Sequence, residues 1–370
     1  MKKRILTGAE IIWECIIREN IDVVFGYPGG TILPAYDALN KYRDKIHHVL
    51  VRHEQGATHM ADGYARASGK VGVAMSTSGP GATNMVTGLA TAKLDSIPIV
   101  CITGQVPKAA IGTDAFQEVD ISGTVLPVTK YSYLVMDIYD LAFTIKEAFT
   151  VARSGRPGPV LIDIPKDVQN DTIEFVYPDE PVRLPGKNLP KKASEKQIQD
   201  AVDLINNAKK PVILAGHGIL LSGASQEIIQ LAETASIPIG WTLLGAGSVP
   251  ASHPLNMGMM GMHGEFAVNN AIQDADLLIA CGMRFDDRVT GNIKTYSPDS
   301  KKIHIDIDPS EINKNVPVDV GISCDLRTAM TQLLPHISRK QNKEWIKTIS
   351  GWQSESLGRD IINVQTDTLY

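Results

Sequence analysis

Cysteine is scarce in this sequence, which has four among 370 residues, at positions 15, 101, 281 and 324. They lie far apart, and Cys101 and Cys281 fall within apolar runs typical of buried strands, so neither a disulfide framework nor a zinc-binding spacing is indicated. Long apolar runs are missing too, because no stretch approaches the roughly 20 residues that cross a bilayer. The basic start continues into an amphipathic helical pattern over 7–20 instead of an apolar signal core. We therefore expect a protein of a reducing compartment, the bacterial cytoplasm, with a plastid as the alternative.

No sign of charge dominates the sequence. Lys and Arg number 36 against 41 Asp and Glu, which gives a formal net charge of −5, and no long block of one sign occurs. This balance argues against nucleic-acid and membrane partners. Apolar residues make up 43% and charged residues 21%, as in ordinary globular proteins, and the length is enough for two or three domains.

Short apolar runs bounded by glycine and proline alternate with helix-length segments, the pattern of βαβ units around a parallel sheet. Strands are predicted at 23–26, 71–76, 97–103, 159–164, 212–215, 277–282 and 303–307. We expect an α/β fold with two open parallel-sheet domains, over residues 1–175 and 193–337. A Pro-, Lys- and Asp-rich linker over 176–192 joins them.

The segment 338–370 is polar, with Trp345, Ile349 and Trp352 at helical spacing. We expect it to connect the second domain to a further one.

Two motifs in the first half lie where predicted strands end and helices begin, the usual ligand crevice of α/β sheets. Glycines of the segment 26–30 would let the backbone approach a ligand closely, although an ordinary strand-to-helix turn explains them as well. Glu54, within 52–57, follows an apolar stretch and opens a helix. A carboxylate in a dry crevice can exchange a proton near neutral pH. The alternative is a first-turn glutamate favoured by the helix dipole.

A third glycine-containing segment, 76–84, follows a predicted strand and opens a helical pattern over 81–94. It is not a dinucleotide fingerprint, because Asn84 stands where that pattern has Gly or Ala, and no lysine completes a Walker motif. Taken alone, it indicates a structural turn.

In the second half, Arg284 and Arg288 are suited to bidentate phosphate contacts, and Asp306 and Asp308 to ribose hydroxyls at a strand end. The alternative is a solvated ion-pair network. His263 between glycines has no partner at ligand spacing, so no metal site is predicted.

Taken together, five segments resemble the thiamine-diphosphate-dependent acetolactate synthase large subunits. They are 26–30 (Gly-Tyr-Pro-Gly-Gly), 52–57 (Arg-His-Glu-Gln-Gly-Ala), 77–84 (Thr-Ser-Gly-Pro-Gly-Ala-Thr-Asn), 114–118 (Asp-Ala-Phe-Gln-Glu) and 155–160 (Gly-Arg-Pro-Gly-Pro-Val). The segment 282–291 (Gly-Met-Arg-Phe-Asp-Asp-Arg-Val-Thr-Gly) is similar to the flavin-binding stretch of the biosynthetic branch.

The resemblance implies a pyrimidine-binding domain, a middle FAD-binding domain and a C-terminal domain that binds the diphosphate through Mg²⁺. The chain matches the first two, and the metal motif is absent from it, so we expect a fragment that is inactive alone. The implied reaction condenses pyruvate with a second pyruvate or 2-oxobutyrate, with loss of carbon dioxide, in branched-chain amino-acid biosynthesis. The alternatives are another carboligase or decarboxylase of the family, or a non-catalytic nucleotide-binding module.

The resemblance also implies residue roles. Glu54 would hydrogen-bond the aminopyrimidine, Gly30 and Gln117 would face the reacting centre, and Phe116 and Lys166 would line its entrance. Further thiamine diphosphate contacts would be Pro28, Gly29, Pro80 and Asn84. Flavin contacts would be Arg156, Gly216, Gly218, Thr242, Leu243, His263, Gly264, Arg284, Asp286, Arg288, Asp306 and Asp325.

Two positions depart from the family pattern, which has glycine at His217 and threonine at Trp241. The resemblance further implies a homodimer or homotetramer and a regulatory small subunit.

Overall fold

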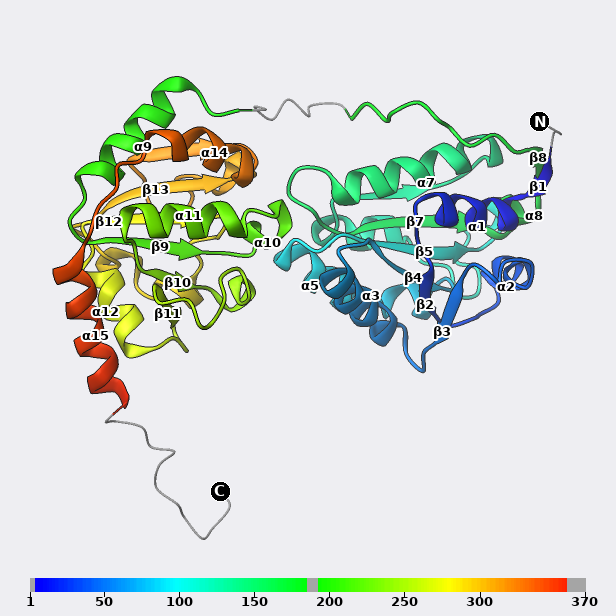
Figure 1. Ribbon diagram of the computed structural model, residues 1–370. Helices are drawn as coiled ribbons and strands as arrows, with labels where there is room; N and C mark the ends of the chain where they lie inside the picture. Colours follow the sequence, from blue (N-terminus) through cyan, green and yellow to red (C-terminus); the bar gives the residue numbers. More distant parts are fainter. Residues whose placement is uncertain (1–3, 185–191, 358–370) are drawn as a thin grey trace, which may run out of the picture. The chain divides into compact units, whose positions relative to one another are not determined.

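The computed structural model describes residues 4–184 and 192–357. The chain divides into two compact units, with the boundary after Lys187, and Figure 1 shows a sheet flanked by helices in each. The boundary lies within the expected linker, of which residues 185–191 are outside the described part, as is 358–370 of the expected connector.

The first unit is built on a six-stranded parallel sheet in the order β3-β2-β4-β5-β7-β6. The strands are β2 (Val23–Gly26), β3 (His47–Leu50), β4 (Gly72–Ser76), β5 (Ile99–Gln105), β6 (Tyr131–Leu134) and β7 (Val160–Pro165). A separate antiparallel pair joins β1 (Ile5–Thr7) to β8 (Thr172–Glu174). Because the six strands are parallel, their carboxyl ends meet at one edge of the sheet.

Helices cover both faces of this sheet. One face carries α1 (Gly8–Arg18), α2 (Leu33–Leu39) and α7 (Ile138–Arg153), and the other carries α3 (Glu54–Ser68), α5 (Val86–Asp95) and α6 (Ile121–Val125). The short helices α4 (Pro80–Thr83), η1 (Lys108–Ala110), η2 (Leu126–Val128) and α8 (Lys166–Asn170) lie in the connections.

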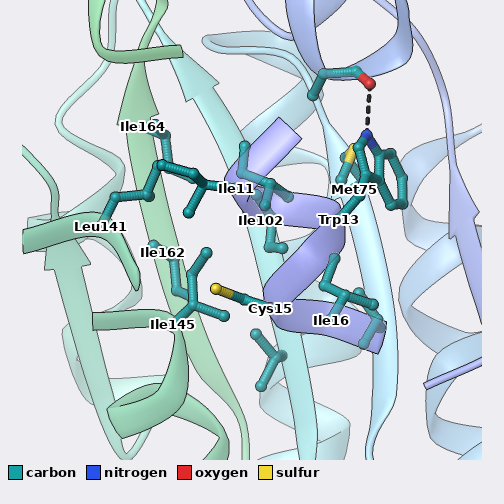
Figure 2. Close-up of a cluster of buried hydrophobic side chains, with 14 of the residues drawn as sticks. Ile11, Trp13, Cys15, Ile16, Met75, Ile102, Leu141, Ile145, Ile162 and Ile164 are labelled. Carbon is teal, nitrogen blue, oxygen red and sulfur yellow. Dashed lines mark hydrogen bonds between the residues drawn. The ribbon is translucent and has the colours of Figure 1, made fainter. Parts of the chain in front are cut away.

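Helix α1 shows how the sequence produces this packing. Thr7 and Glu10 form a capping box at its start, which satisfies two helix-terminal amides. Figure 2 shows its side chains directed at the sheet and at α7, among them the buried Trp13. The Trp13 indole donates to the carbonyl of Ala35 at 2.6 Å, which ties α1 to α2. Burial of an amphipathic helix against the strands is what stabilises this face of the unit.

The second unit has a parallel sheet in the order β11-β10-β9-β12-β13-β14. The strands are β9 (Pro211–Ala215), β10 (Ile239–Trp241), β11 (Asn256–Met259), β12 (Leu277–Cys281), β13 (Lys301–Asp306) and β14 (Val320–Ser323). The expected α/β class with two open parallel sheets is thereby confirmed.

The helices of the second unit also lie on both faces of its sheet. One core contains α9 (Glu195–Asn207), α11 (Ser225–Ala235) and α14 (Leu326–Leu333), and the other contains α12 (Phe266–Asp274) and α15 (Lys343–Leu357). Shorter helices are α10 (Gly218–Ser222), η3 (Leu243–Gly245), α13 (Asp287–Thr290), η4 (Ile293–Thr295), η5 (Pro309–Glu311) and η6 (Leu334–His336).

Helix α15 belongs to the second core. Trp345 and Ile349 are buried, and the Trp345 indole donates to the carbonyl of Pro211 at 3.1 Å. Part of the segment expected to be a connector therefore packs on the unit that precedes it. In the described part of the chain, no helix has the length and apolar character needed to cross a membrane.

Candidate functional site

The sheet of the first unit changes direction between β2 and β4. From β2 the chain passes to β3 on one side and then returns to β4 on the other. In open α/β sheets ligands bind at such a point, which here is the carboxyl ends of β2 and β4. A Cβ on Gly29 would lie 2.5 Å from the Cβ of Thr77, so only glycine fits there. The hydroxyls of Thr31 and Thr77 are 2.9 Å apart, and the Ser78 amide donates to Thr31 Oγ1 at 3.0 Å. The loops after β2 and β4 are therefore bonded together.

Glu54 is the first residue of α3, and its side chain is buried at this edge of the sheet. Its Oε2 accepts from Asn84 Nδ2 at 2.9 Å. A Cβ on Gly81 would lie 3.3 Å from Oε1, so a larger residue at position 81 would crowd that oxygen. His53, not Glu54, caps α3, because its ring accepts from the Gln55 amide. The carboxylate is thus directed at the turn after β4.

Tyr36 and His48 lie beside this site, and sequence reasoning missed both. Their Oη and Nε2 atoms are 3.1 Å apart, and a Cβ on Gly26 would clash with the Tyr36 hydroxyl. Burial, and then the charge of Glu54, raise the pKa of Tyr36. Burial also lowers the pKa of His48. Both groups are therefore neutral near pH 7. Nothing in the sequence distinguishes Tyr36 from an ordinary helix residue, so no local signal could have found it.

The loop after β5 reaches the same turn. Gln117 has a φ of +60° and Gly79 a φ of +55°. A Cβ on Gly79 would lie 2.6 Å from the carbonyl oxygen of Gln117 and 2.9 Å from its Cα. The backbone of Gln117 therefore lies directly on Gly79, which requires glycine because of both the contact and the positive φ.

The other predicted residues of this group lie at the same edge of the sheet. Gly30 faces open space at its Cβ position. Phe116 is 88% exposed on the loop after β5, and Lys166 begins α8 directly after β7. Pro28 follows β2, and Pro80 begins α4. Arg156, predicted as a flavin contact, lies elsewhere in this unit: it precedes β7, at the amino edge of the sheet, where its guanidinium donates to Ser96 Oγ at 2.7 Å.

The second sheet has a matching change of direction between β9 and β12. The Gly218 amide donates to the carbonyl of Gly282 at 2.9 Å. A Cβ on Gly218 would lie 2.6 Å from the Cα of Gly282, and one on Gly216 would clash with the Gly282 carbonyl. Two glycine loops therefore touch at the carboxyl ends of β9 and β12, the position where open α/β sheets bind their ligands.

The remaining predicted residues of the second unit follow the ends of its other strands. Thr242 and the exposed Leu243 come after β10, His263 and Gly264 after β11, and Asp325 after β14. Asp306 ends β13, where its Oδ1 accepts from the Asp308 amide at 2.8 Å. Oxygen and nitrogen groups of several loops thus gather along one edge of this sheet.

The ion pairs given above as the alternative to phosphate contacts are present in the structure. They involve Arg284, Asp286 and Arg288. Arg284 Nη2 is 3.5 Å from Asp286 Oδ2, and Arg288 Nη2 is 3.5 Å from Asp287 Oδ2. Asp286 also caps α13. The side chain of Arg284 is 31% exposed and that of Arg288 67%, so Arg284 is the better placed of the two for a partly buried anion.

Of the two positions that depart from the family pattern, Trp241 forms a bond between two strands. Trp241 Nε1 donates to Asn256 Oδ1 at 3.0 Å, which links β10 to the start of β11. His217 is the residue before α10.

The residues present fit both implied groups. The buried Glu54 carboxylate and the open Gly30 suit an aminopyrimidine ring, and the glycine loops at the ends of β9 and β12 suit a dinucleotide. Within 4–184 and 192–357, no three or more His, Cys, Asp and Glu side chains are grouped as a metal site.

Two family models match the chain, one in each unit. Residues 6–124 match the description "Thiamine pyrophosphate enzyme, N-terminal TPP binding domain", and residues 198–333 match "Thiamine pyrophosphate enzyme, central domain". Glu54, Asn84 and Gln117 lie in the first match, and the glycine loops around Gly218 and Gly282 lie in the second.

Curated relatives are similar along most of the chain. The acetolactate synthase large subunit of Corynebacterium glutamicum is 50% identical over 94% of this chain. A probable acetolactate synthase large subunit of Methanocaldococcus jannaschii is 48% identical over 93%, and an acetolactate synthase of Mycobacterium bovis is 48% identical over 94%. The chain spans 55%, 59% and 56% of the lengths of these relatives.

Proposed function

The chain belongs to the thiamine pyrophosphate enzymes, as their N-terminal and central domains, and from this premise we propose that it serves an acetolactate synthase. The proposed reaction is the decarboxylative condensation of two pyruvates, or of pyruvate and 2-oxobutyrate. The observation that carries the proposal is the buried Glu54 carboxylate at the change of direction of the first sheet. The identity of the chain with the named relatives, 48% to 50%, supports the choice of substrates.

Glu54 would hold the aminopyrimidine of thiamine diphosphate. Asn84 occupies Oε2, so Oε1 is the oxygen available to exchange a proton with a ring nitrogen of the ligand. Tyr36 and His48, both neutral, add no competing charge beside it. When bound, the cofactor supplies the nucleophilic carbon and the electron sink for decarboxylation and carbon–carbon bond formation.

The loops around Glu54 would orient the ring and keep water out. Gly29 and Gly79 let backbone segments lie against Thr77 and Gln117, which fixes the walls of the crevice without mobile side chains. Pro28, Gly30 and Pro80 would complete these walls, and Phe116 and Lys166 would flank the approach of the 2-oxo acid. Such fixed positioning contributes a large part of enzymatic rates.

FAD would bind at the crevice of the second unit. The touching loops of Gly216, Gly218 and Gly282 would bring backbone amides to its diphosphate, with Arg284 as the charged contact. Asp306 and Asp325 would accept from hydroxyl groups.

Several further expectations stay predictions. They concern Mg²⁺ bound outside these residues, a homodimer or homotetramer, a regulatory small subunit and a cytoplasmic location.

Removal and return of the cofactors tests the proposed function. The full-length gene product is stripped of bound cofactors and assayed for acetolactate formation from pyruvate. We expect activity to return with thiamine diphosphate and Mg²⁺ together and to require FAD for full recovery. Activity that is independent of thiamine diphosphate would contradict the proposal.

A further inference from the structure

We propose that Gln105 is a positioning residue: its side-chain amide ties together both ends of the loop 106–119 and so holds the backbone of Gln117 on the turn after β4. The loop follows β5, of which Gln105 is the last residue. The loop's part in the reaction rests on the proposed function, whereas the tie itself rests on the geometry alone.

One amide group reaches both ends of the loop. Gln105 Oε1 accepts from the Val106 amide at 2.8 Å, and Gln105 Nε2 donates to the carbonyl of Val119 at 3.0 Å. The side chain is 3% exposed. The bond to Val106 is buried and the bond to Val119 is partly buried. Removal of the amide leaves the buried Val106 N–H without its acceptor, and the Val119 carbonyl keeps only the Ile121 amide, at 2.9 Å. A buried donor without an acceptor favours local opening.

A buried carboxylate fixes the orientation of this amide. Gln105 Nε2 also donates to Asp163 Oδ2 at 2.8 Å, and Asp163 Oδ1 accepts from Thr103 Oγ1 at 2.6 Å. Asp163 and Thr103 are 2% and 0% exposed. An ionised carboxylate only accepts hydrogen bonds, so the NH₂ end of Gln105 must face Asp163. The oxygen end is then directed at Val106, and the amide cannot serve the two loop ends in the reverse order.

The middle of the loop is held by other groups. Glu118 accepts from the amides of Gly112 and Ala115, and the Lys108 amide donates to Asp167 Oδ1 at 3.2 Å. These bonds shape the loop and attach it to α8. Gln105 joins the two ends of the loop, so we expect a substitution there to let the whole loop open more often, its inner bonds included.

The loop is connected to Glu54 through the turn after β4. The backbone of Gln117 lies on Gly79, which immediately precedes α4, and α4 ends beside Asn84, the partner of Glu54. Gln105 therefore acts at a distance, through Gln117 and Gly79, on the spacing between Gln117 and Glu54. In the proposed function that spacing sets the reacting centre, where a displacement of about 1 Å can cost about 10²-fold in rate.

Two variants of Gln105 test the tie. Gln105→Asn keeps a polar amide but is one methylene too short to bond both loop ends, and Gln105→Leu removes the amide at similar size. The matched control is Trp13→Phe, which removes a buried side-chain bond to a backbone carbonyl on α2, away from the loop.

The first readout is backbone hydrogen exchange in the 370-residue chain, which requires no cofactor and no activity. We expect exchange over 106–119 to rise about tenfold or more in both Gln105 variants, with α1 unchanged, and the loop to keep wild-type exchange in Trp13→Phe. If Gln105→Leu prevents folding, the Gln105→Asn variant alone decides. Unchanged exchange in a folded Gln105 variant would overturn the tie.

The second readout is the split between kcat and KM in the full-length protein, with rates expressed per bound cofactor. We expect kcat to fall about 10- to 100-fold in Gln105→Asn, while the KM for pyruvate changes less than about threefold. A loosened loop with wild-type kcat would refute the positioning role. A wild-type protein that makes no acetolactate would refute the proposed function but leave the exchange result standing.

Discussion

Replacement of Glu54 by glutamine separates proton exchange from shape at the candidate site. Glu54 is 8% exposed, and its Oε2 accepts from Asn84. The substituted side chain can keep that bond with its own amide oxygen, so the fold should lose less than about 1 kcal/mol. An amide cannot exchange the proton that a carboxylate exchanges. We therefore expect turnover of the full-length protein to fall about 10²- to 10⁴-fold, which corresponds to roughly 2.7 to 5.5 kcal/mol of activation free energy.

The assay is acetolactate formation from pyruvate, measured beside thermal unfolding of each variant. Glu14→Gln is the matched control, because Glu14 is 9% exposed in the same unit, lies on α1 and pairs with Arg4. It should keep turnover. Glu54→Gln with wild-type turnover and an intact fold would refute the role of Glu54.

Other consequences follow from the second sheet and from the buried carboxylate of the first. Arg284→Ala should weaken flavin binding about 10- to 150-fold in a fluorescence titration. Arg288→Ala should weaken it less, because the side chain of Arg288 is more exposed. Equal flavin affinities of the wild type and both variants would favour the ion-pair alternative. Burial raises the pKa of Asp163 to about 6, with a smaller contribution from the charge of Asp120. The hydrogen bonds that its carboxylate accepts lower the pKa, but burial outweighs them. Between about pH 4 and 6 the folded state therefore holds a proton that the unfolded chain has lost. The contribution of Asp163 to stability should fall by on the order of 3 kcal/mol over this range, opposite in sign to that of carboxylates with a lowered pKa, such as Asp319. Asp163→Asn should abolish that slope in denaturant unfolding, and an unchanged slope would show that another group causes it.

The central strands of the first sheet could be predicted from the sequence more completely than its edge strands. The predicted runs 71–76, 97–103 and 159–164 correspond to β4, β5 and β7, which are covered on both faces and therefore read as continuous apolar segments. The edge strands β3 and β6 are half-exposed. Only the apolar stretch before Glu54 indicates the end of β3, which begins with His47 and His48, and neither an apolar run nor alternation marks β6. In the second sheet the edge strands β11 and β14 were missed likewise, together with the short β10.

The candidate site, too, could be predicted from the sequence only in part. The position of Glu54 at a strand end and helix start is a local pattern, and the structure has that arrangement. Its bond to Asn84, and the contact of Gln117 with Gly79, join segments far apart in the chain, and no local signal encodes them. The expected helix over 81–94 is divided after Thr83 into α4 and α5, and this break is where Asn84 reaches Glu54.

The products formed from pyruvate test the central claim most directly. The full-length protein, loaded with thiamine diphosphate, Mg²⁺ and FAD, is given pyruvate alone, and carbon dioxide and acetolactate are both quantified. Condensation of two pyruvates releases one carbon dioxide for each acetolactate formed, so the account predicts equal amounts of the two. Carbon dioxide released without acetolactate, or pyruvate left unconsumed, would contradict it.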